Sequence, residues 1–301
     1  MVANRTLTVS ENGTLLPFLL TALSTMGRNK VKSLLTHGQV MVNDQVVTRH
    51  DHPLVQGQTV SILAMRKVSS DDLDGVQILF EDDDVLVIDK PAGLLSMGTD
   101  TEKEHTAYRI LGDYMRMKNP KSRIFIVHRL DRDTSGVMMF AKRESVQQKL
   151  QNAWKDVVVE RAYLAVVEGR VQQDTGTIIS WLKESKTLIM YISRKEGDGQ
   201  KAITHYEVLH RTGEYSLLKV QLETGRKNQI RVQMQSIGHP VVGDDRYGAI
   251  KDPLGRLGLH ASVLSFHHPT TDKVMRFETD FPSAFLRVFS YDQKASVTIK
   301  S

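Results

Sequence analysis

A carboxylate stands between two arginines in the nine residues from His128 to Gly136, which read His-Arg-Leu-Asp-Arg-Asp-Thr-Ser-Gly. The cations at positions 129 and 132 favour an ionised Asp131. Gly136 permits a tight turn that presents this carboxylate ahead of an apolar strand, Val137 to Phe140. On charge content alone, a cluster of surface salt bridges explains the same residues.

The pattern His-Arg-Leu-Asp-x-x-Thr-Ser-Gly resembles the catalytic signature of the RluA-type pseudouridine synthases, which isomerise uridine in RNA. The resemblance implies that Asp131 is the nucleophile. It also places Arg129 at the family position that enters the space left by a flipped uridine, whose sugar–base bond is unreachable inside a stacked helix. The family implies no cofactor, nucleotide or metal.

Two further segments match blocks of the same family. Glu160 to Gly169 contains a basic-x-Tyr-x-Ala pattern, and the resemblance gives Tyr163 the role of packing on the base and helping to remove the proton from carbon 5. A lone tyrosine in an apolar strand is otherwise usually core packing. Arg231 corresponds to the arginine that pairs with the catalytic aspartate. We expect it to be a fixed bidentate partner that orients Asp131 and compensates its charge, the alternative being a structural arginine at a helix start.

The resemblance also supplies candidate substrate contacts. The segment Thr224 to Arg231 reads Thr-Gly-Arg-Lys-Asn-Gln-Ile-Arg, where the family usually has Gly-Arg-Thr-His-Gln-Ile-Arg. Arg226 and Gln229 are kept, whereas Lys227-Asn228 departs from the usual pattern and puts the substrate contact there in doubt. Leu259 corresponds to the apolar side chain that packs near the bound base.

The histidines of these segments are expected to be structural. His128 is a candidate general base, but its place in the motif favours a hydrogen-bonded structural role. His267 and His268 are adjacent, so their imidazoles point apart and a turn is favoured over a metal site. The chain has no cysteine, which excludes disulfides and thiolate zinc sites.

The elements that must position these residues mix strands with helices. Apolar runs and alternation predict strands at residues 78–80, 85–88, 137–140, 157–167 and 217–223, and helical periodicity predicts helices at 105–115, 146–154 and 230–237. A parallel doubly wound sheet is the alternative, but the chain lacks a glycine-rich phosphate loop and many strands follow one another directly. The predicted fold class is α+β, with a mainly antiparallel mixed sheet flanked by helices and a small α/β N-terminal domain.

The N-terminal part predicts a smaller unit. Leucines at 15, 16, 19, 20 and 23 recur at helical spacing, a second helix ends at Gly38, and residues 40–47 and 59–63 predict a hairpin and a strand. About residues 13–65 resemble the S-four-type RNA-binding domain, named after a ribosomal protein, and the pattern that carries the resemblance runs from Arg28 to Asn43. The resemblance implies that Arg28, Lys30 and Lys32 contact RNA phosphates. A generic helix-helix-hairpin unit with a solvated basic face is the alternative.

Charge divides the chain at the end of this unit. The whole chain of 301 residues has a net charge of +5, with +4 in residues 1–68 and −7 in residues 69–90. The polar, acidic stretch Ser69 to Gly75 is typical of a linker. The predicted domains are residues 1–68 (S-four-type), 69–76 (acidic linker) and 77–301 (catalytic).

Composition fits a soluble globular protein, with 40% hydrophobic and 25% charged residues. The lack of a leader or a long apolar stretch predicts a cytoplasmic protein with no membrane contact. The expected partner is structured RNA, with large-subunit ribosomal RNA favoured over transfer RNA, and a monomer is the default. The other function classes are a non-catalytic RNA-binding or ribosome-assembly factor, and an aspartate-based hydrolase of small molecules. The intact trio of Asp131, Tyr163 and Arg231 disfavours the first, and the lack of paired carboxylates disfavours the second.

Overall fold

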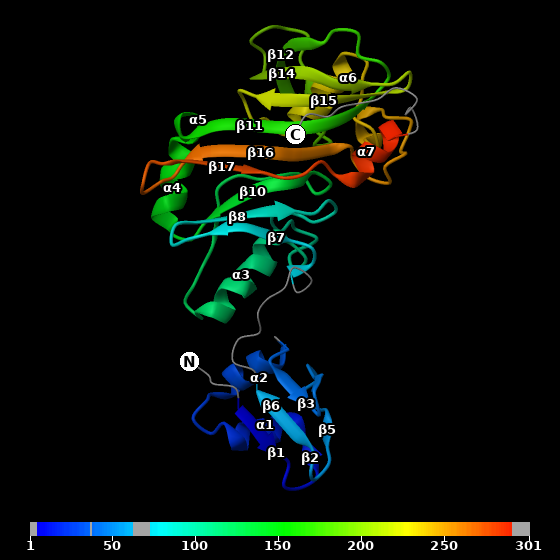
Figure 1. The fold of residues 1–301 in the computed structure, drawn as a ribbon. Coiled ribbons are helices and arrows are strands. Elements are labelled where there is room, and N and C mark those ends of the chain that lie inside the picture. Colours follow the sequence, from blue (N-terminus) through cyan, green and yellow to red (C-terminus); the bar gives the residue numbers. More distant parts are fainter. Residues whose placement is uncertain (1–4, 37, 63–72, 291–301) are drawn as a thin grey trace. The chain divides into compact units, whose positions relative to one another are not determined.

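The computed structural model describes residues 5–36, 38–62 and 73–290. The chain divides into two compact units, Met1–Ser69 and Ser70–Ser301 (Figure 1). Each unit has its own hydrophobic core. Residues 69–72 of the predicted acidic linker lie outside the described residues. Within the described ranges, no helix is long and apolar enough to cross a membrane.

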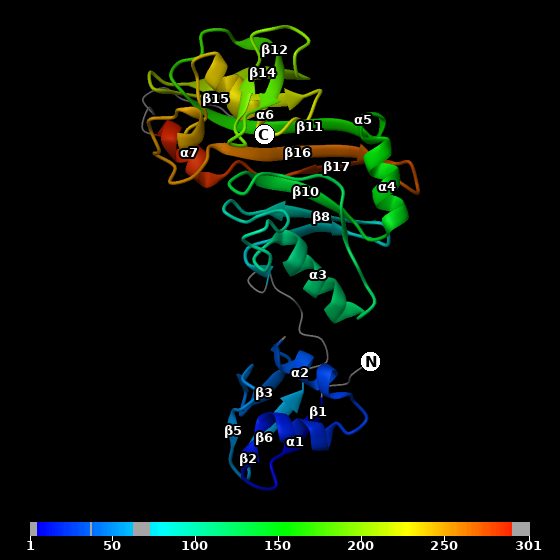
Figure 2. The ribbon, with the colours of Figure 1, turned by 180° about the vertical axis from the view of Figure 1, so that it is seen from behind.

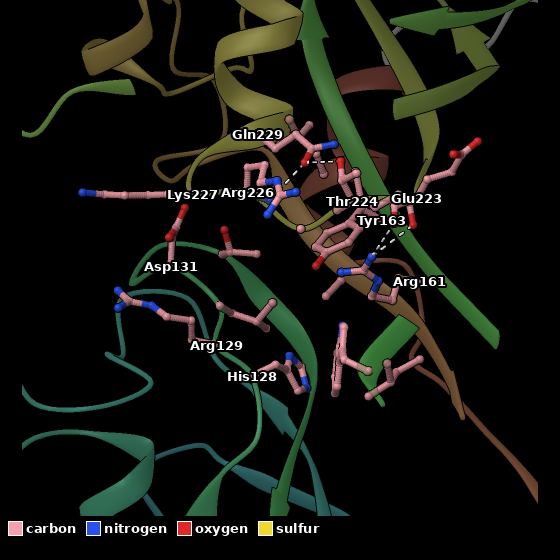
Figure 3. Close-up of a pocket in the computed structure, with 18 of the residues that line it drawn as sticks. His128, Arg129, Asp131, Arg161, Tyr163, Glu223, Thr224, Arg226, Lys227 and Gln229 are labelled. Atoms are coloured by element: carbon pink, nitrogen blue, oxygen red, sulfur yellow. Dashed lines mark hydrogen bonds between the residues drawn. The ribbon is translucent and has the colours of Figure 1, made fainter. Parts of the chain in front are cut away.

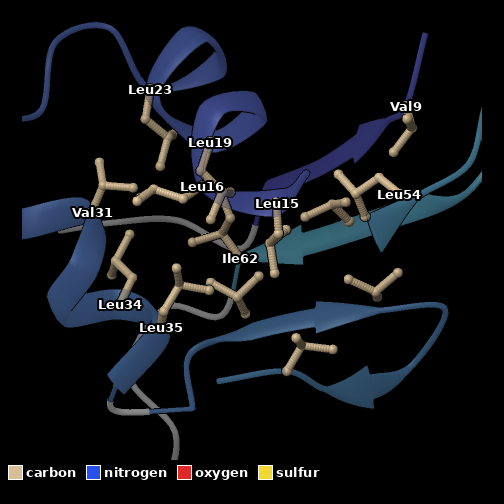
Figure 4. Packing of buried hydrophobic residues seen from close by; sticks show 14 residues of the cluster. Val9, Leu15, Leu16, Leu19, Leu23, Val31, Leu34, Leu35, Leu54 and Ile62 are labelled. Carbon is tan, nitrogen blue, oxygen red and sulfur yellow. The ribbon is translucent and has the colours of Figure 1, made fainter. Parts of the chain in front are cut away.

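The first unit packs two helices, α1 (Leu15–Ala22) and α2 (Arg28–Thr36), against small antiparallel sheets. Figure 4 shows Leu15 and Leu19 of α1 in one buried cluster with Val31 and Leu35 of α2 and with Ile62. One sheet has the order β1-β6-β3-β4, and β2 pairs with β5. The strands are β1 (Arg5–Thr8), β2 (Gly13–Thr14), β3 (Val40–Val42), β4 (Gln45–Val46), β5 (Pro53–Leu54) and β6 (Thr59–Ile62).

The predicted helices and hairpin of this unit are confirmed. Asn43 and Asp44 connect β3 to β4 with φ of 47° and 65°. Two consecutive positive φ values are typical of the two-residue turn that matches the twist of a hairpin, and Asn and Asp tolerate them better than most residues. The last residue of the predicted strand 59–63 lies outside the described residues.

The second unit is built on an eleven-stranded sheet with the order β13-β12-β14-β15-β11-β16-β10-β8-β7, where β17 also pairs with β16 and β9 with β10. In the described part of the chain its pairs are antiparallel, apart from β10 with β16. The predicted mainly antiparallel mixed sheet is therefore confirmed. The strands are β7 (Gln77–Glu81), β8 (Val85–Lys90), β9 (Phe125–Ile126), β10 (Ser135–Ala141), β11 (Val158–Glu168), β12 (Thr175–Glu184), β13 (Met190–Ile192), β14 (Gln200–Arg211), β15 (Tyr215–Leu222), β16 (Leu259–His267) and β17 (Val274–Glu278).

Helices flank this sheet, and in both views α3 lies beside β7 and β8 (Figures 1 and 2). The predicted helix 146–154 is interrupted, because α4 ends at Asn152 and the short α5 begins at Trp154. The helices are α3 (Ala107–Lys118), α4 (Glu144–Asn152), α5 (Trp154–Val157), α6 (Gln229–Ser236) and α7 (Ser283–Ser290), with a 3₁₀ turn at Asp245–Tyr247.

Strand β10 is an internal strand of the sheet, between β16 and β8, and all seven of its residues are buried. The prediction that Gly136 forms a tight turn needs correction, because Gly136 lies within β10 and pairs with Ala261 of β16. A Cβ at Gly136 would lie 2.1 Å from the carbonyl oxygen of Ala261. Glycine is required here because the two strands approach so closely.

Candidate active site

A cavity of about 700 Å³ opens in the second unit, between the loop before β10, strands β11 and β16, and the loop before α6. Figure 3 shows Asp131, Tyr163 and Arg226 around a common space. The cavity is lined by all seven candidate site residues predicted for this unit, namely Asp131, Tyr163, Arg231, Arg129, Arg226, Gln229 and Leu259. Chain folding thus brings together residues from four separate segments.

A buried lysine, Lys90, holds the loop that carries Asp131. The Nζ of Lys90 donates to the backbone carbonyls of Pro91 (2.9 Å), Leu94 (2.7 Å) and Arg132 (3.0 Å). Three donated hydrogen bonds require the ammonium form, although burial lowers the pKa of Lys90 to about 8. This contact fixes the backbone directly after Asp131.

A second contact fixes the backbone directly before Asp131. The hydroxyl of Ser96 donates to the carbonyl of Leu130 (2.7 Å) and accepts from the N–H of the same residue (3.1 Å). The N–H of Gly93 donates to the carbonyl of Arg132 (3.0 Å). The backbone is therefore held on both sides of Asp131, whose own side chain is 31% exposed to the cavity.

Arg231 is shared between two carboxylates. Its Nε and Nη2 donate to both oxygens of Asp244, at 2.6 and 2.7 Å, and the side chain of Asp244 is fully buried. Its Nη1 lies 3.6 Å from Oδ2 of Asp131 and donates to Oδ1 of Asn228 at 3.3 Å. Burial acts to lower the pKa of Arg231, but the hydrogen bonds and charge of Asp244, with a smaller contribution from Asp131, raise it. The expected bidentate pair with Asp131 is wrong, because the bidentate partner is Asp244.

Sequence reasoning missed Asp244, although one local signal was available. Asp244 follows two buried valines and Gly243, whose φ is +73°. A carboxylate at a buried turn needs a cationic partner to compensate its desolvation. That partner is distant enough in the sequence that only the fold identifies it as Arg231.

Tyr163 projects into the cavity from β11 at a register shift against β16. Ala162 pairs with Val263 but Tyr163 pairs with Ala261, so Ser262 is an extra residue on the β16 side. Such a bulge redirects side chains and is common near active sites. Burial raises the pKa of Tyr163, Arg161 lowers it and Asp131 raises it further. The net shift is upward, so the hydroxyl is protonated at neutral pH.

Gln229 lines the cavity, but its amide is occupied by protein partners. Its Oε1 accepts from the Thr224 hydroxyl (2.8 Å) and the Arg226 N–H (3.0 Å), and its Nε2 donates to the Ile203 carbonyl (3.0 Å) and the Thr204 hydroxyl (2.8 Å). These four bonds use its donors and acceptors. The geometry therefore favours shaping of the loop before α6 over the predicted direct substrate contact.

Positions 227 and 228, where the chain departs from the family pattern, have different environments. Lys227 is exposed and forms an ion pair with Glu184. Asn228 is buried, has a φ of 52°, and donates to the hydroxyl of Tyr247 at 3.0 Å while it accepts from Arg231. Asparagine tolerates this backbone conformation, and its side chain supports the catalytic arginine candidate.

The remaining candidate residues differ in their exposure to solvent. Arg129 is exposed at the cavity, and within the described residues it makes no hydrogen bond or ion pair. Leu259 is buried and lines the cavity from β16, whereas Arg226 donates through Nε to the carbonyl of Lys201 at 3.1 Å. The three candidate RNA-contact residues of the first unit are exposed on α2, and they are Arg28, Lys30 and Lys32.

The two adjacent histidines are structural. His267 ends β16, and His268 precedes a turn and bonds to Oδ2 of Asp82 at 2.9 Å. The predicted turn is confirmed. Among the described residues, no group of three or more histidine, aspartate or glutamate side chains has the arrangement of a metal site.

Comparisons with known proteins point to one family. The family model described as RNA pseudouridylate synthase matches residues 84–236, about half of the chain. The chain is 35% identical over 277 residues to the uncharacterized RNA pseudouridine synthase YlyB of Bacillus subtilis, covering 88% of this chain and 89% of that protein. It is 32% identical to ribosomal large subunit pseudouridine synthase D of Buchnera aphidicola, over 85% of this chain and 86% of that one.

Solved structures agree with this fold. The human RNA pseudouridylate synthase domain containing 1 protein has a TM-score of 0.57 at 27% identity, covering 72% of this chain and 87% of that one. The human RNA pseudouridylate synthase domain containing 4 protein has a TM-score of 0.59 at 24% identity, covering 71% of this chain and 92% of that one. The second likeness concerns the fold alone.

Proposed function

Because the chain belongs to the RNA pseudouridylate synthase family, we propose that it isomerises specific uridines of large-subunit ribosomal RNA, with Asp131 as the nucleophile. The enzyme class itself, an RNA pseudouridine synthase, follows from the family. The observation that carries the proposal is the single cavity that Asp131, Tyr163 and Arg231 share. Similarity to a ribosomal large subunit synthase favours the target, and transfer RNA is the alternative.

The reaction exchanges one bond to the sugar for another. The bond from N1 of uracil to C1′ of ribose breaks, the base turns, and carbon 5 joins C1′. Carbon 5 then loses a proton and N1 gains one, so atoms and electrons balance without an added group. Asp131 assists by attacking either the sugar or the uracil ring, and its partial exposure leaves it accessible to both.

Tyr163 is assigned to removal of the proton from carbon 5. In the free enzyme the negative charge of Asp131 helps to keep the pKa of Tyr163 high, whereas Arg161 lowers it. The hydroxyl is protonated in the free enzyme, so it can take the proton from carbon 5 only after giving up its own proton. The positive charge of Arg161 favours that loss.

Arg231 is assigned to orientation of Asp131. Its fork is fixed by Asp244, so the direction of its remaining Nη1 is set before substrate binds. A preorganised donor needs no rearrangement during the reaction. Arg129 is assigned to the space left by the flipped uridine because it is exposed at the cavity.

The first unit is assigned to RNA binding as an S-four-type domain. Its α2 helix buries Val31 on one side and exposes Arg28, Lys30 and Lys32. Exposed cations on one helix suit contacts with the phosphate backbone, which carry affinity but little sequence information. We also propose that the protein is cytoplasmic, in keeping with a ribosomal RNA target, and that it acts as a monomer, since Asp131, Tyr163 and Arg231 of one chain line the same cavity.

The test is position-resolved pseudouridine mapping of total RNA from cells with the intact protein, without it, and with the variant Asp131→Asn. The expected result is a uridine in large-subunit ribosomal RNA that is modified only with the intact protein. Modification restored by Asp131→Asn would remove Asp131 as the nucleophile, and a site found only in transfer RNA would overturn the ribosomal target. Tyr163→Phe should bind the mapped RNA like the intact protein but release tritium from carbon 5 more slowly.

A further inference from the structure

The cavity extends beyond the assigned catalytic residues. In Figure 3, Arg161 lies between Tyr163 and His128, and the electrostatic influence of Arg161 on both residues agrees with this placement. The imidazole of His128 lies 5.0 Å from the Trp154 ring, centroid to centroid. We call this part of the cavity the distal lobe, and it is lined by His128, Trp154, Arg161, Val137, Val263 and Leu264.

His128 presents a hydrogen-bond donor to the distal lobe. Its Nε2 accepts from the backbone N–H of Met139 at 3.0 Å, so Nε2 carries no proton. Burial, together with the charge of Arg161, lowers the pKa of His128 to about 3, so the ring is neutral and its proton is on Nδ1. Within the described residues Nδ1 has no hydrogen-bond partner. Every fully buried side-chain nitrogen or oxygen atom of those residues does have a partner, so Nδ1 is not one of the buried atoms. The Nδ1–H is therefore reachable from the cavity.

Arg161 contributes a planar guanidinium group to the distal lobe. Burial lowers the pKa of Arg161, and its Nη2 donates to the carbonyls of Leu222 (3.3 Å) and Glu223 (3.4 Å). Gly225 makes room for it, because a Cβ there would lie 2.6 Å from Nη1. A guanidinium held in this way offers a plane on which a base can stack.

We propose that the distal lobe binds a second, unpaired base of the RNA strand that carries the target uridine, with the Nδ1–H of His128 donating to an acceptor on that base. Aromatic rings and guanidinium planes are the groups on which proteins stack unpaired RNA bases. The acceptor would be a pyrimidine carbonyl or the N7 or O6 of a purine. At about 700 Å³ the whole cavity is in the range that encloses drug-sized ligands, which leaves room beyond one uracil ring.

Two variants of His128 separate this contact from the structural one. His128→Gln places an amide oxygen near the position of Nε2, so it can still accept from Met139, but it loses the donor at Nδ1. His128→Asn does the reverse, because its shorter amide lies near Nδ1 and leaves the buried N–H of Met139 unpaired. The Asn variant should therefore melt about 2–12 °C below the Gln variant, yet retain more activity at a temperature where both are folded.

The experiment measures kcat/KM of the full chain on short RNAs that contain the mapped target uridine, each with one neighbouring nucleotide made abasic. On intact RNA, His128→Gln should lower kcat/KM by about 2- to 12-fold, as expected for one hydrogen bond. On RNA that lacks one particular neighbouring base, the intact protein should lose activity about 5-fold or more, and His128→Gln should cause no further loss. Trp154→Phe should also lower kcat/KM on intact RNA, and it should cause no further loss on the RNA that lacks this same base.

An equal loss for His128→Gln on every RNA, or no loss on any, would overturn the distal lobe as a second-base site. The inference rests on the proposed action on RNA uridines but not on which RNA is the target, because the substrate is taken from the mapping result. Failure of the intact protein to modify any RNA would count against the proposed function instead. The two failures are therefore distinguishable.

Discussion

Replacing Asp244 with Asn should destabilise the second unit, because it removes the charge that compensates a mostly buried arginine. The side chain of Arg231 is 13% exposed, and its other carboxylate neighbour, Asp131, lies 3.6 Å away. Removal of one partner from a buried ion pair costs roughly 3–5 kcal/mol. Asn keeps one oxygen for Arg231, and Asp131 supplies part of the charge. We therefore expect the lower end, a loss of about 3 kcal/mol.

The stability of the second unit can be measured by itself. Both tryptophans of the chain, Trp154 and Trp181, lie in that unit. Thermal unfolding followed by tryptophan fluorescence therefore reports on it and not on the first unit. A loss of about 3 kcal/mol corresponds to a decrease in Tm of roughly 6–12 °C for a unit of this size.

The neighbouring residue supplies the control. Asp245 is exposed, and Asp245→Asn makes the same chemical change one position later. A surface substitution of this kind usually changes stability by less than about 0.5 kcal/mol. Equal Tm values for Asp244→Asn and Asp245→Asn would refute the reasoning. In the Asp244 variant kcat should also fall while RNA affinity changes little, since Arg231 loses the contact that sets its direction.

Three other changes test separate parts of the molecule. Arg129→Ala should slow turnover of structured RNA far more than that of a short unpaired oligonucleotide, because unstacking a base costs a few kcal/mol; equal losses in kcat/KM would assign Arg129 to phosphate contact or folding. Replacing the three basic residues of α2 (Arg28, Lys30 and Lys32) with Gln should flatten the slope of log affinity against log salt by about 2–3, at roughly 0.7–0.9 for each phosphate contact; an unchanged slope in titrations would show that this helix does not anchor RNA. Between pH 6.5 and about 3, His128 is protonated in the unfolded chain but not in the folded chain. The unfolding free energy should therefore decrease as the pH is lowered through this range, by up to about 1.4 kcal/mol per pH unit. His128→Gln should show a shallower decrease in chemical denaturation, and an identical pH dependence would contradict the neutral assignment.

Local patterns were sufficient to predict many elements that carry the site. The apolar run after Gly136 predicts β10, and the stripe from Ile230 to Ile237 predicts α6. In both segments the spacing of the apolar residues follows the positions that the folded element buries. The break between α4 and α5 at Ala153 was not predicted. The residues there continue a helical periodicity, and packing of Trp154 beside His128 is a tertiary contact that periodicity does not encode.

The pairing of side chains within the site was beyond local patterns. The motif resemblance gave Arg231 one partner, Asp131, whereas the structure gives it Asp244 as well. The contact between β10 and β16 joins residues more than 120 positions apart, and it depends on the missing side chain of Gly136. Such contacts depend on where whole strands come to lie, so neither spacing nor composition reports them.

The division of Arg231 between two carboxylates bears on how Asp131 can react. A carboxylate held by two short hydrogen bonds to a guanidinium is strongly stabilised as an anion, and that stabilisation has to be given up when it forms a covalent bond. In this protein Asp244, which is fully buried, takes both short bonds, and among the described residues Asp131 has a single ion-pair contact, at 3.6 Å. The loop backbone is meanwhile fixed by Lys90 and Ser96. Asp131 is therefore positioned by its backbone and oriented by one N–H, which leaves its oxygens available for attack.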